Sequence, residues 1–146
     1  MSIRVLVVDD SPLVRAVLRM VLSHADDITV IGEAGDGLAA ERKAKELKPD
    51  VITMDVLMPM RGGLDTIAAI MEECPTPIVV VADAQGDTQN LAMEALGHGA
   101  MEVFPKPTSG FDESATRELL ACIRRSARVR LRAPSMMRRR KLTAQR

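Results

Sequence analysis

The stretch Val51-Ile-Thr-Met-Asp-Val-Leu-Met-Pro59 decides the fold of this chain. Its first half is β-branched and apolar, which is typical of a strand buried on both faces, and that strand ends on the carboxylate of Asp55. Two other apolar runs also end in charged residues: Asp9 and Asp10 follow the first, and Lys106 follows the last. These charges can converge only if the strands are parallel, because parallel strands end at one edge of a sheet.

The rest of the chain supports that arrangement, because strands alternate with helices and the connections are short. This pattern predicts an α/β fold with a doubly wound parallel sheet of five strands and five helices, in the flavodoxin-like order 2-1-3-4-5. Ligands of such sheets bind at the switch point between strands 1 and 3, where Asp9, Asp10 and Asp55 lie. The expected strands are 3–8, 28–31, 51–54, 78–82 and 101–104, and the expected helices are about 12–24, 38–47, 64–73, 88–96 and 112–128.

Three carboxylates in one small crevice repel one another unless a cation lies between them. A hard divalent ion with oxygen ligands suits such a site, and we expect Mg²⁺ at Asp9, Asp10 and Asp55. Taken alone, Asp9 and Asp10 are better interpreted as a solvated acidic turn. It is their combination with Asp55 and Lys106 that favours a metal site.

Composition limits the other functions. The chain has 146 residues, two Phe and no Tyr or Trp, so its core is aliphatic and stacking on nucleic-acid bases is nearly excluded. Cys74 and Cys122 lack ligand spacing and are interpreted as structural thiols, with a disulfide or metal role as the alternative. Neither a membrane-spanning apolar run nor a leader sequence is found, which favours a cytoplasmic location.

The formal net charge of zero hides an asymmetry between the two ends of the chain. Residues 1–123 hold all 20 acids and 10 basic residues, a net −10, whereas residues 124–146 hold the other 10 basic residues and no acid. We expect residues 129–146 to form a basic tail or a shortened interdomain linker. Attachment of this tail to an acidic partner, a membrane surface or nucleic acid is the alternative, although the lack of stacking aromatics weighs against nucleic acid.

Several motifs together resemble the receiver domain of two-component response regulators. They are Val7-Val8-Asp9-Asp10-Ser11, Asp55-Val-Leu-Met58-Pro59 with Gly63-Leu64-Asp65, and Phe104-Pro-Lys106-Pro107. Pro75-Thr-Pro77, Ala95-Leu-Gly-His-Gly99-Ala100 and Lys106-Pro-Thr-Ser-Gly110 narrow the resemblance to the receiver of the chemotaxis protein-glutamate methylesterase. The match covers about residues 2–128 and implies a receiver domain over residues 1–128. No room remains for the methylesterase domain, so we expect either a fragment or shortened homologue, or a stand-alone receiver that docks to an output protein.

The resemblance implies a role for each site residue. Asp55 would be the phospho-acceptor, taking a phosphoryl group from a sensor histidine kinase. Asp10, Asp55 and the backbone carbonyl of Leu57 would hold Mg²⁺ directly, and Asp9 would act through a metal-bound water. Lys106 would pair with the phosphoryl oxygens, and its bond to Pro107 is expected to be cis. Enzymatic activity would be limited to self-phosphorylation from a phosphodonor and autodephosphorylation.

The chain departs from the family where the signal should leave the site. Ala82 occupies the position at the end of strand 4 where receivers carry a Ser or Thr switch residue, and Asp83 follows it. Val103 replaces the aromatic switch residue of strand 5. The alternative function is therefore a pseudo-receiver, or docking module, with weakened phospho-switching.

Overall fold

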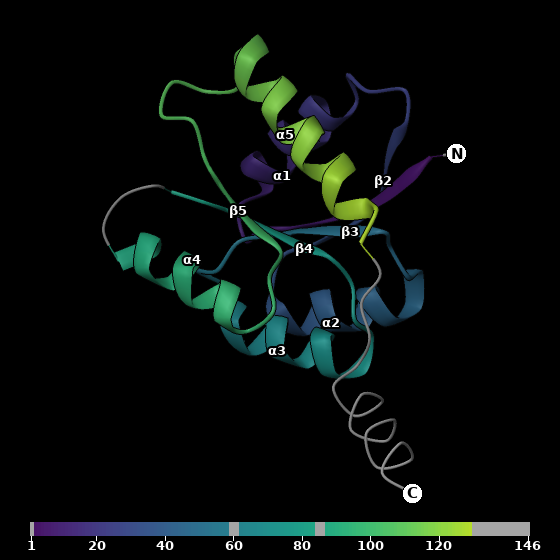
Figure 1. Cartoon of the computed structure of the whole chain (residues 1–146), viewed down its shortest axis with the longest axis vertical. Coiled ribbons are helices and arrows are strands. Elements are labelled where there is room, and N and C mark those ends of the chain that lie inside the picture. The colour runs from purple at the N-terminus through teal and green to yellow at the C-terminus, as the bar shows by residue number, and fades with distance from the viewer. Residues whose placement is uncertain (1, 59–61, 84–86, 130–146) are drawn as a thin grey trace, which may run out of the picture.

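The structure is a computed structural model that describes residues 2–58, 62–83 and 87–129. Five strands alternate with five helices along this part of the chain (Figure 1). The predicted basic tail lies outside the described residues except for Val129. The elements are β1 Ile3–Val8, α1 Pro12–Leu22, β2 Ile28–Ala34, α2 Gly37–Leu47, β3 Val51–Met54, α3 Gly63–Glu73, β4 Ile78–Ala82, α4 Asp87–Gly97, β5 Glu102–Pro105 and α5 Glu113–Ala127.

The strands form one parallel sheet in the order β2-β1-β3-β4-β5, which confirms the predicted fold. Helices α1 and α5 cover one face, and α2, α3 and α4 cover the other (Figure 1). Strands β1 and β3 are neighbours in the middle of the sheet, with Val8 opposite Met54. The residues that follow these two strands are therefore placed side by side.

Alternation along the central strands divides the core into two layers. Val5, Val7 and Val79 face α1 and α5, and they pack with Leu18 and Ile123. Leu6, Ile52, Met54, Val80 and Ile67 pack on the opposite face. All of these side chains are almost completely buried, so the aliphatic residues supply the hydrophobic core that the composition predicts.

Strand β2 is longer than predicted, since it continues beyond Ile31 to Ala34. Its pairing with β1 shifts register between Val5 and Leu6: Val5 pairs with Val30, and Leu6 with Gly32. Ile31 is thus the extra residue of a bulge. A Cβ atom on Gly32 would lie 2.8 Å from the Cδ1 atom of Leu47, so this glycine lets α2 pack closely against the strand.

The two phenylalanines stabilise the connection between β5 and α5. The rings of Phe104, which is buried, and Phe111 stack with their centroids 6.2 Å apart and an interplanar angle of 9°. The connection also carries Lys106, and it ends at Asp112, whose side chain caps α5 by accepting a hydrogen bond from the Ala115 N–H. The connection is thereby fixed at both ends.

Both cysteines are free thiols, in agreement with a structural interpretation. Cys122 is buried in α5, and burial, together with the nearby Glu102, raises the pKa of its thiol to about 12. Burial also raises the pKa of Cys74, which is half-buried at the end of α3. Neither thiol therefore has the lowered pKa of a reactive cysteine.

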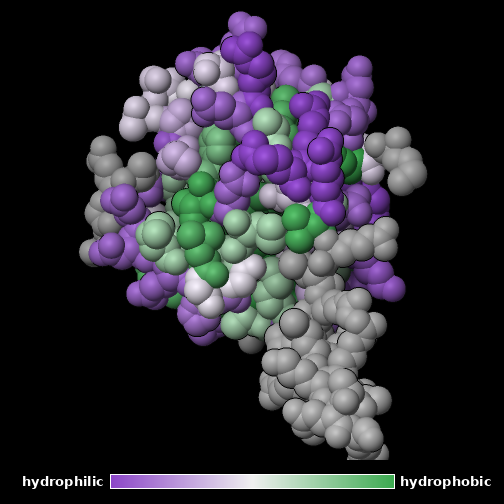
Figure 2. Space-filling view, in the orientation of Figure 1, coloured by the Kyte–Doolittle hydropathy of each residue, from purple (hydrophilic) through white to green (hydrophobic). Residues whose placement is uncertain are grey.

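The surface shows one apolar area on the face that carries α4 (Figure 2). Met93 and Leu96 of α4 are exposed, and Val103 of the neighbouring edge strand β5 is half-buried. In the described part of the chain, no helix combines the length and apolar character needed to cross a membrane.

Candidate functional site

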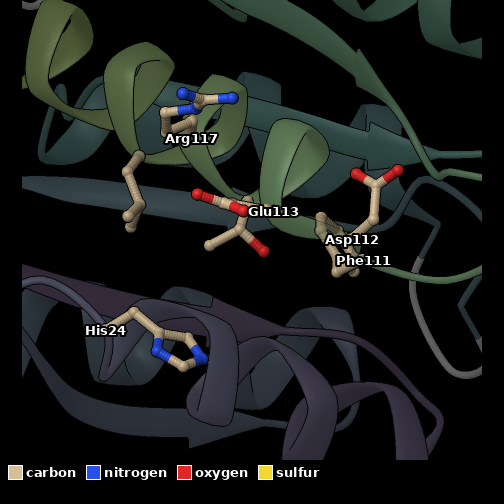
Figure 3. A pocket seen from close by; sticks show the side chains of 7 residues that line it. His24, Phe111, Asp112, Glu113 and Arg117 are labelled. Carbon is tan, nitrogen blue, oxygen red and sulfur yellow. The ribbon is translucent and has the colours of Figure 1, made fainter.

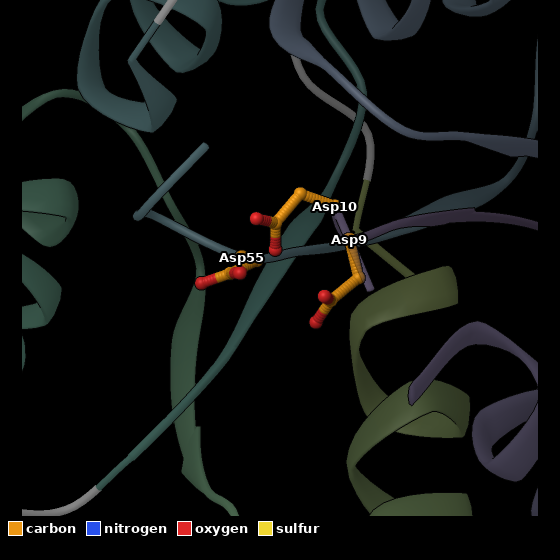
Figure 4. A group of neighbouring side chains, drawn as sticks. All are labelled: Asp9, Asp10 and Asp55. Atoms are coloured by element: carbon orange, nitrogen blue, oxygen red, sulfur yellow. The ribbon is translucent and has the colours of Figure 1, made fainter. Parts of the chain in front are cut away.

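The structure brings three carboxylates together at the carboxyl ends of β1 and β3 (Figure 4). Asp9 and Asp10 lie in the turn between β1 and α1, and Asp55 directly follows β3. Each residue offers an oxygen atom, and these atoms all lie within 4.8 Å of one another. Asp9 and Asp55 are buried, whereas Asp10 is exposed at the mouth of the cluster.

Asp9 connects the cluster to the end of β5. Its Oδ1 atom accepts a hydrogen bond from the Ser11 N–H at 2.9 Å, and its Oδ2 atom lies 3.3 Å from the Nζ atom of Lys106. The Lys106 N–H in turn donates to the carbonyl of Ala82 at 2.8 Å. Lys106 thus stands beside the acids, as the convergence of parallel strands predicts.

Asp55 lies in an environment that disfavours the ionised form of its carboxyl group. Burial raises its pKa from 3.8 to about 6, and the charges of Asp9 and Asp10 act in the same direction. The Leu57 N–H, which donates to Oδ1 of Asp55 at 3.1 Å, and the ammonium of Lys106 partly oppose this increase. At pH 7 Asp55 is still mostly ionised, so it remains available as a ligand or nucleophile.

Gly63 allows the segment after β3 to fold closely over the start of α3. Its N–H donates to the carbonyl of Val56 at 3.2 Å. A Cβ atom at this position would lie 2.5 Å from the Val56 Cα atom and 2.9 Å from the carbonyl oxygen of Asp55, which are both backbone atoms. Only glycine fits here without a shift of the segment that carries Asp55.

The donor set fits a divalent cation. Three carboxylates face one ammonium, so a net negative charge remains at the mouth of a mostly buried site. The three oxygen atoms lie within 4.8 Å of one another, and carboxylate oxygens are the ligands that a hard cation such as Mg²⁺ prefers. Asp9, Asp10 and Asp55 are therefore suitable ligands, whereas the proposed role of the Leu57 carbonyl stays a prediction.

Two other predicted features lie next to the cluster. Ala82 ends β4 and is buried, and Asp83 after it is exposed. The expectation of a cis bond between Lys106 and Pro107 is wrong, because no described peptide bond is cis. The physical reason is that Lys106 already reaches Asp9 with this bond in the trans form, which X–Pro bonds prefer.

Sequence reasoning missed Arg15 and Glu33. Arg15 of α1 donates from Nη1 to the carbonyl oxygen of Asp9 at 2.7 Å, and its Nε atom lies 3.3 Å from a carboxylate oxygen of Glu33 in β2. The only signal in the sequence is a charged residue in the otherwise apolar first turns of α1. The partner in the site is a backbone carbonyl, which no side-chain pattern reveals.

A separate cavity of about 440 Å³ lies between the end of α1 and the start of α5 (Figure 3). His24 stands on one side, and Asp112, Glu113 and Arg117 stand on the other. The acids here accompany a helix start, where Asp112 already serves as the cap. We therefore assign the chemistry to the acidic cluster and not to this cavity.

Comparison with known proteins points to one family. The sequence model of the response regulator receiver domain matches residues 5–119. The protein-glutamate methylesterase/protein-glutamine glutaminase 5 of Myxococcus xanthus is 45% identical over 135 residues, which cover 90% of this chain and 39% of that protein. The corresponding protein of Thermotoga maritima is 41% identical over 130 residues, which cover 87% and 38%. The chain thus spans about two fifths of the length of these relatives.

Solved structures agree. The crystal structure of the response regulator domain of Thermotoga maritima CheB matches with a TM-score of 0.79 and 40% identity, over 89% of this chain and 99% of that domain. A chain of the CheX–CheY–BeF3–Mg²⁺ complex from Borrelia burgdorferi matches with a TM-score of 0.70 and 27% identity, over 87% and 90%.

Proposed function

Because this chain belongs to the family of response regulator receiver domains, we propose that it accepts a phosphoryl group on Asp55 in a chemotaxis-type two-component pathway. The observation that carries the proposal is the position of Asp55, buried beside Asp9, Asp10 and Lys106 at the switch point of the sheet. The donor is the phosphohistidine of a sensor histidine kinase.

In the transfer step a carboxylate oxygen of Asp55 attacks the phosphorus atom. A P–O bond to Asp55 forms as the P–N bond of the phosphohistidine breaks, and the electron pair of the broken bond stays on the imidazole nitrogen. Negative charge is spread over the phosphoryl oxygens during the transfer. Lys106 would pair with one of these oxygens, and its ion pair with Asp9 beside the acids supports this role.

Asp10, Asp55 and the backbone carbonyl of Leu57 would hold Mg²⁺ directly, and Asp9 would support the ion indirectly. The ion, when bound, neutralises charge on the phosphoryl oxygens and on the acids themselves. The acids have two tasks: Asp55 provides the nucleophile, and Asp9 and Asp10 keep the cation next to it. Burial and the charges of Asp9 and Asp10 raise the pKa of Asp55, so a cation at the cluster would favour its ionised form.

A kinase partner is supported by the surface beside Lys106. An apolar groove of about 190 Å³ lies between α1 and the segment after β5, and its lining includes Leu13, Val17, Lys106, Pro107 and Phe111. Leu13 is 74% exposed there and lines the same groove as Lys106. We expect Leu13→Gln to slow transfer from the kinase but not from acetyl phosphate, whereas Met20→Gln, at another exposed position later on α1, should change neither.

The methylesterase activity of the relatives is not part of this proposal, because the chain spans only about two fifths of their length. The domain's own chemistry is limited to taking up a phosphoryl group and losing it to water. Its output is exerted on an effector domain or an output protein, and the apolar surface at Met93 and Leu96 is available for such contacts.

A pseudo-receiver is the second candidate, and a specific observation favours it. The buried Ala82 has no hydroxyl group with which to bind a phosphoryl oxygen, and Asp83 adds a negative charge nearby. In this case Asp55 would bind metal and take up phosphate, but α4 and β5 would respond weakly.

The test is the intact mass after incubation with acetyl phosphate, with and without Mg²⁺, and with Asp55→Asn as the control. A Mg²⁺-dependent gain of one phosphoryl group that is absent in the control is the expected result. No gain, together with intact Mg²⁺ binding, would reject phospho-acceptance and leave the docking role.

A further inference from the structure

Arg15 is bonded to the peptide group that joins Asp9 to Asp10. Its Nη1 atom donates to the carbonyl oxygen of Asp9 at 2.7 Å, and only 20% of its side chain is exposed. A peptide group is planar, so the carbonyl of Asp9 and the amide of Asp10 turn as one rigid unit. The guanidinium therefore restrains the orientation of the link from which Asp10 reaches the cluster.

The guanidinium is itself held from a neighbouring strand. Glu33 of β2 accepts from the Arg15 Nε atom at 3.3 Å, and its second carboxylate oxygen pairs with Arg19. Glu33 lies opposite Val7 in the sheet, two positions before Asp9. Arg15 thus links the turn that carries Asp9 and Asp10 to Glu33, whose position is set by the pairing of β2 with β1.

The fold also leaves room for this side chain. A Cβ atom on Gly35 would lie 3.2 Å from the Nη1 atom of Arg15, closer than most Cβ contacts allow. The end of β2 therefore contributes both a carboxylate that binds the guanidinium and a glycine that makes space for it.

We propose that Arg15 is a positioning residue of the metal site: through the Asp9 carbonyl it sets the arrangement of Asp9 and Asp10 and thereby the affinity for Mg²⁺. This inference rests on the proposed function, because it assumes that the acidic cluster binds the cation. Arg15 is not itself a ligand, since a guanidinium has no acceptor atom.

The positive charge of Arg15 and its bond to Asp9 predict opposite changes in Mg²⁺ affinity when Arg15 is substituted. A positive guanidinium repels a nearby cation, so removal of its charge alone should tighten Mg²⁺ binding. If the bond to Asp9 positions the ligands, its removal should weaken Mg²⁺ binding, as the loss of groups that orient metal ligands commonly does. The sign of the change therefore separates the two roles.

The experiment is a Mg²⁺ titration followed by amide NMR shifts at constant ionic strength, on the wild type, Arg15→Gln and Arg19→Gln. Arg19 is the matched control, because it carries the same charge on the same helix and binds the same Glu33, but has no bond to Asp9. We expect about tenfold weaker binding for Arg15→Gln and less than a twofold change for Arg19→Gln. Arg15→Lys, which keeps a donor for the carbonyl, should recover most of the affinity.

Unchanged or tighter Mg²⁺ binding by Arg15→Gln would overturn the inference. A mere structural role would lower the unfolding temperature without changing the Mg²⁺ affinity. If Arg15→Gln does not fold, Gly35→Ala is the second variant: its methyl group would force the guanidinium to shift by a few tenths of an ångström without removing a charge, so it should weaken Mg²⁺ binding, and an unchanged affinity would count against the inference. Failure of the wild type to bind Mg²⁺ would instead reject the metal site of the proposed function, so the two failures are distinguishable.

Discussion

The ammonium of Lys106 lies 3.3 Å from a carboxylate oxygen of Asp9, although 97 positions separate the two residues in the chain. The sheet order brings them together, because β1, β3, β4 and β5 are successive neighbours in the sheet and all end at the same edge. Lys106 is consequently a cation that pairs directly with a carboxylate of the cluster, and its removal should affect metal binding and phosphoryl transfer in opposite directions.

For Lys106→Met we expect Mg²⁺ to bind a few times more tightly, since a competing positive charge is lost. Phosphorylation by acetyl phosphate should slow at least about tenfold, because one phosphoryl oxygen loses its partner. Amide NMR titration and intact-mass time courses measure the two effects. Lys45→Met is the control, because Lys45 pairs with Glu41 and Glu73 far from the cluster. Weaker Mg²⁺ binding by Lys106→Met would contradict the assignment.

Asp55 should make the metal-free protein less stable above pH 6. Its pKa is about 6 in the folded protein against 3.8 ordinarily, so between these values the folded state holds a proton that the unfolded chain has lost. The free energy of unfolding should therefore fall as the pH rises from about 4 to about 6, and stay lower above that range.

Asp55→Asn should lack this part of the pH dependence. At pH 7 without Mg²⁺ we expect the variant to be more stable than the wild type by about 2 kcal/mol. Urea unfolding followed by circular dichroism at pH 4 and pH 7 measures the difference, with the exposed Asp26→Asn as control. Addition of Mg²⁺ should reverse the order, because only the wild type retains all three acids. A variant less stable than the wild type at pH 7 would disprove the argument.

Gly63 and Gly62 form a matched pair of adjacent glycines. A methyl group on Gly63 would collide with the backbone of Asp55 and Val56, whereas no atom of the described residues lies within 4 Å of the corresponding position on Gly62. We expect Gly63→Ala to reduce the free energy of unfolding by at least about 2 kcal/mol and to weaken Mg²⁺ binding. Gly62→Ala should cost less than about 1 kcal/mol at this helix start. Equal effects of the two substitutions in urea unfolding would reject the steric explanation.

Ala82→Thr tests whether the missing hydroxyl limits signalling. The residue ends β4 beside the Lys106 segment, so a hydroxyl there could bind a phosphoryl oxygen. If coupling is weak in the wild type, phosphorylation should shift few amide signals of α4 and β5, and Ala82→Thr should add such shifts. Ala82→Ser introduces the same hydroxyl with less volume into this buried position and serves as the second variant. Strong phosphorylation-dependent shifts in the wild type would show that the hydroxyl is not needed.

The main features of the fold and the acidic cluster could be predicted because they depend on strong local patterns. Apolar runs such as Val51–Met54 and Ile78–Ala82 have the observed strand boundaries, and a charged residue after a strand must lie at the edge where parallel strands end. Asp9, Asp10 and Asp55 meet for that reason.

The missed features depend on contacts that have no periodic pattern. Ile31 was expected to end β2, but the bulge and Gly32 let the strand continue to Ala34 and bring Glu33 next to Arg15. Arg15 then binds a backbone carbonyl, and since every residue has this group, the sequence does not mark which carbonyl is bound. Such contacts become visible only when the strand register is known.

The stacked pair of Phe104 and Phe111 has a practical consequence, because these are the only aromatic rings of the Phe, Tyr and Trp type in the chain. The chain has no indole or phenol chromophore, so the Trp and Tyr fluorescence commonly used to follow proteins is absent. Its aromatic NMR spectrum, apart from the two histidines, contains just two ring systems, and Phe104 lies two residues before Lys106. These rings are a native spectroscopic probe of the segment that carries the lysine, and no label has to be introduced.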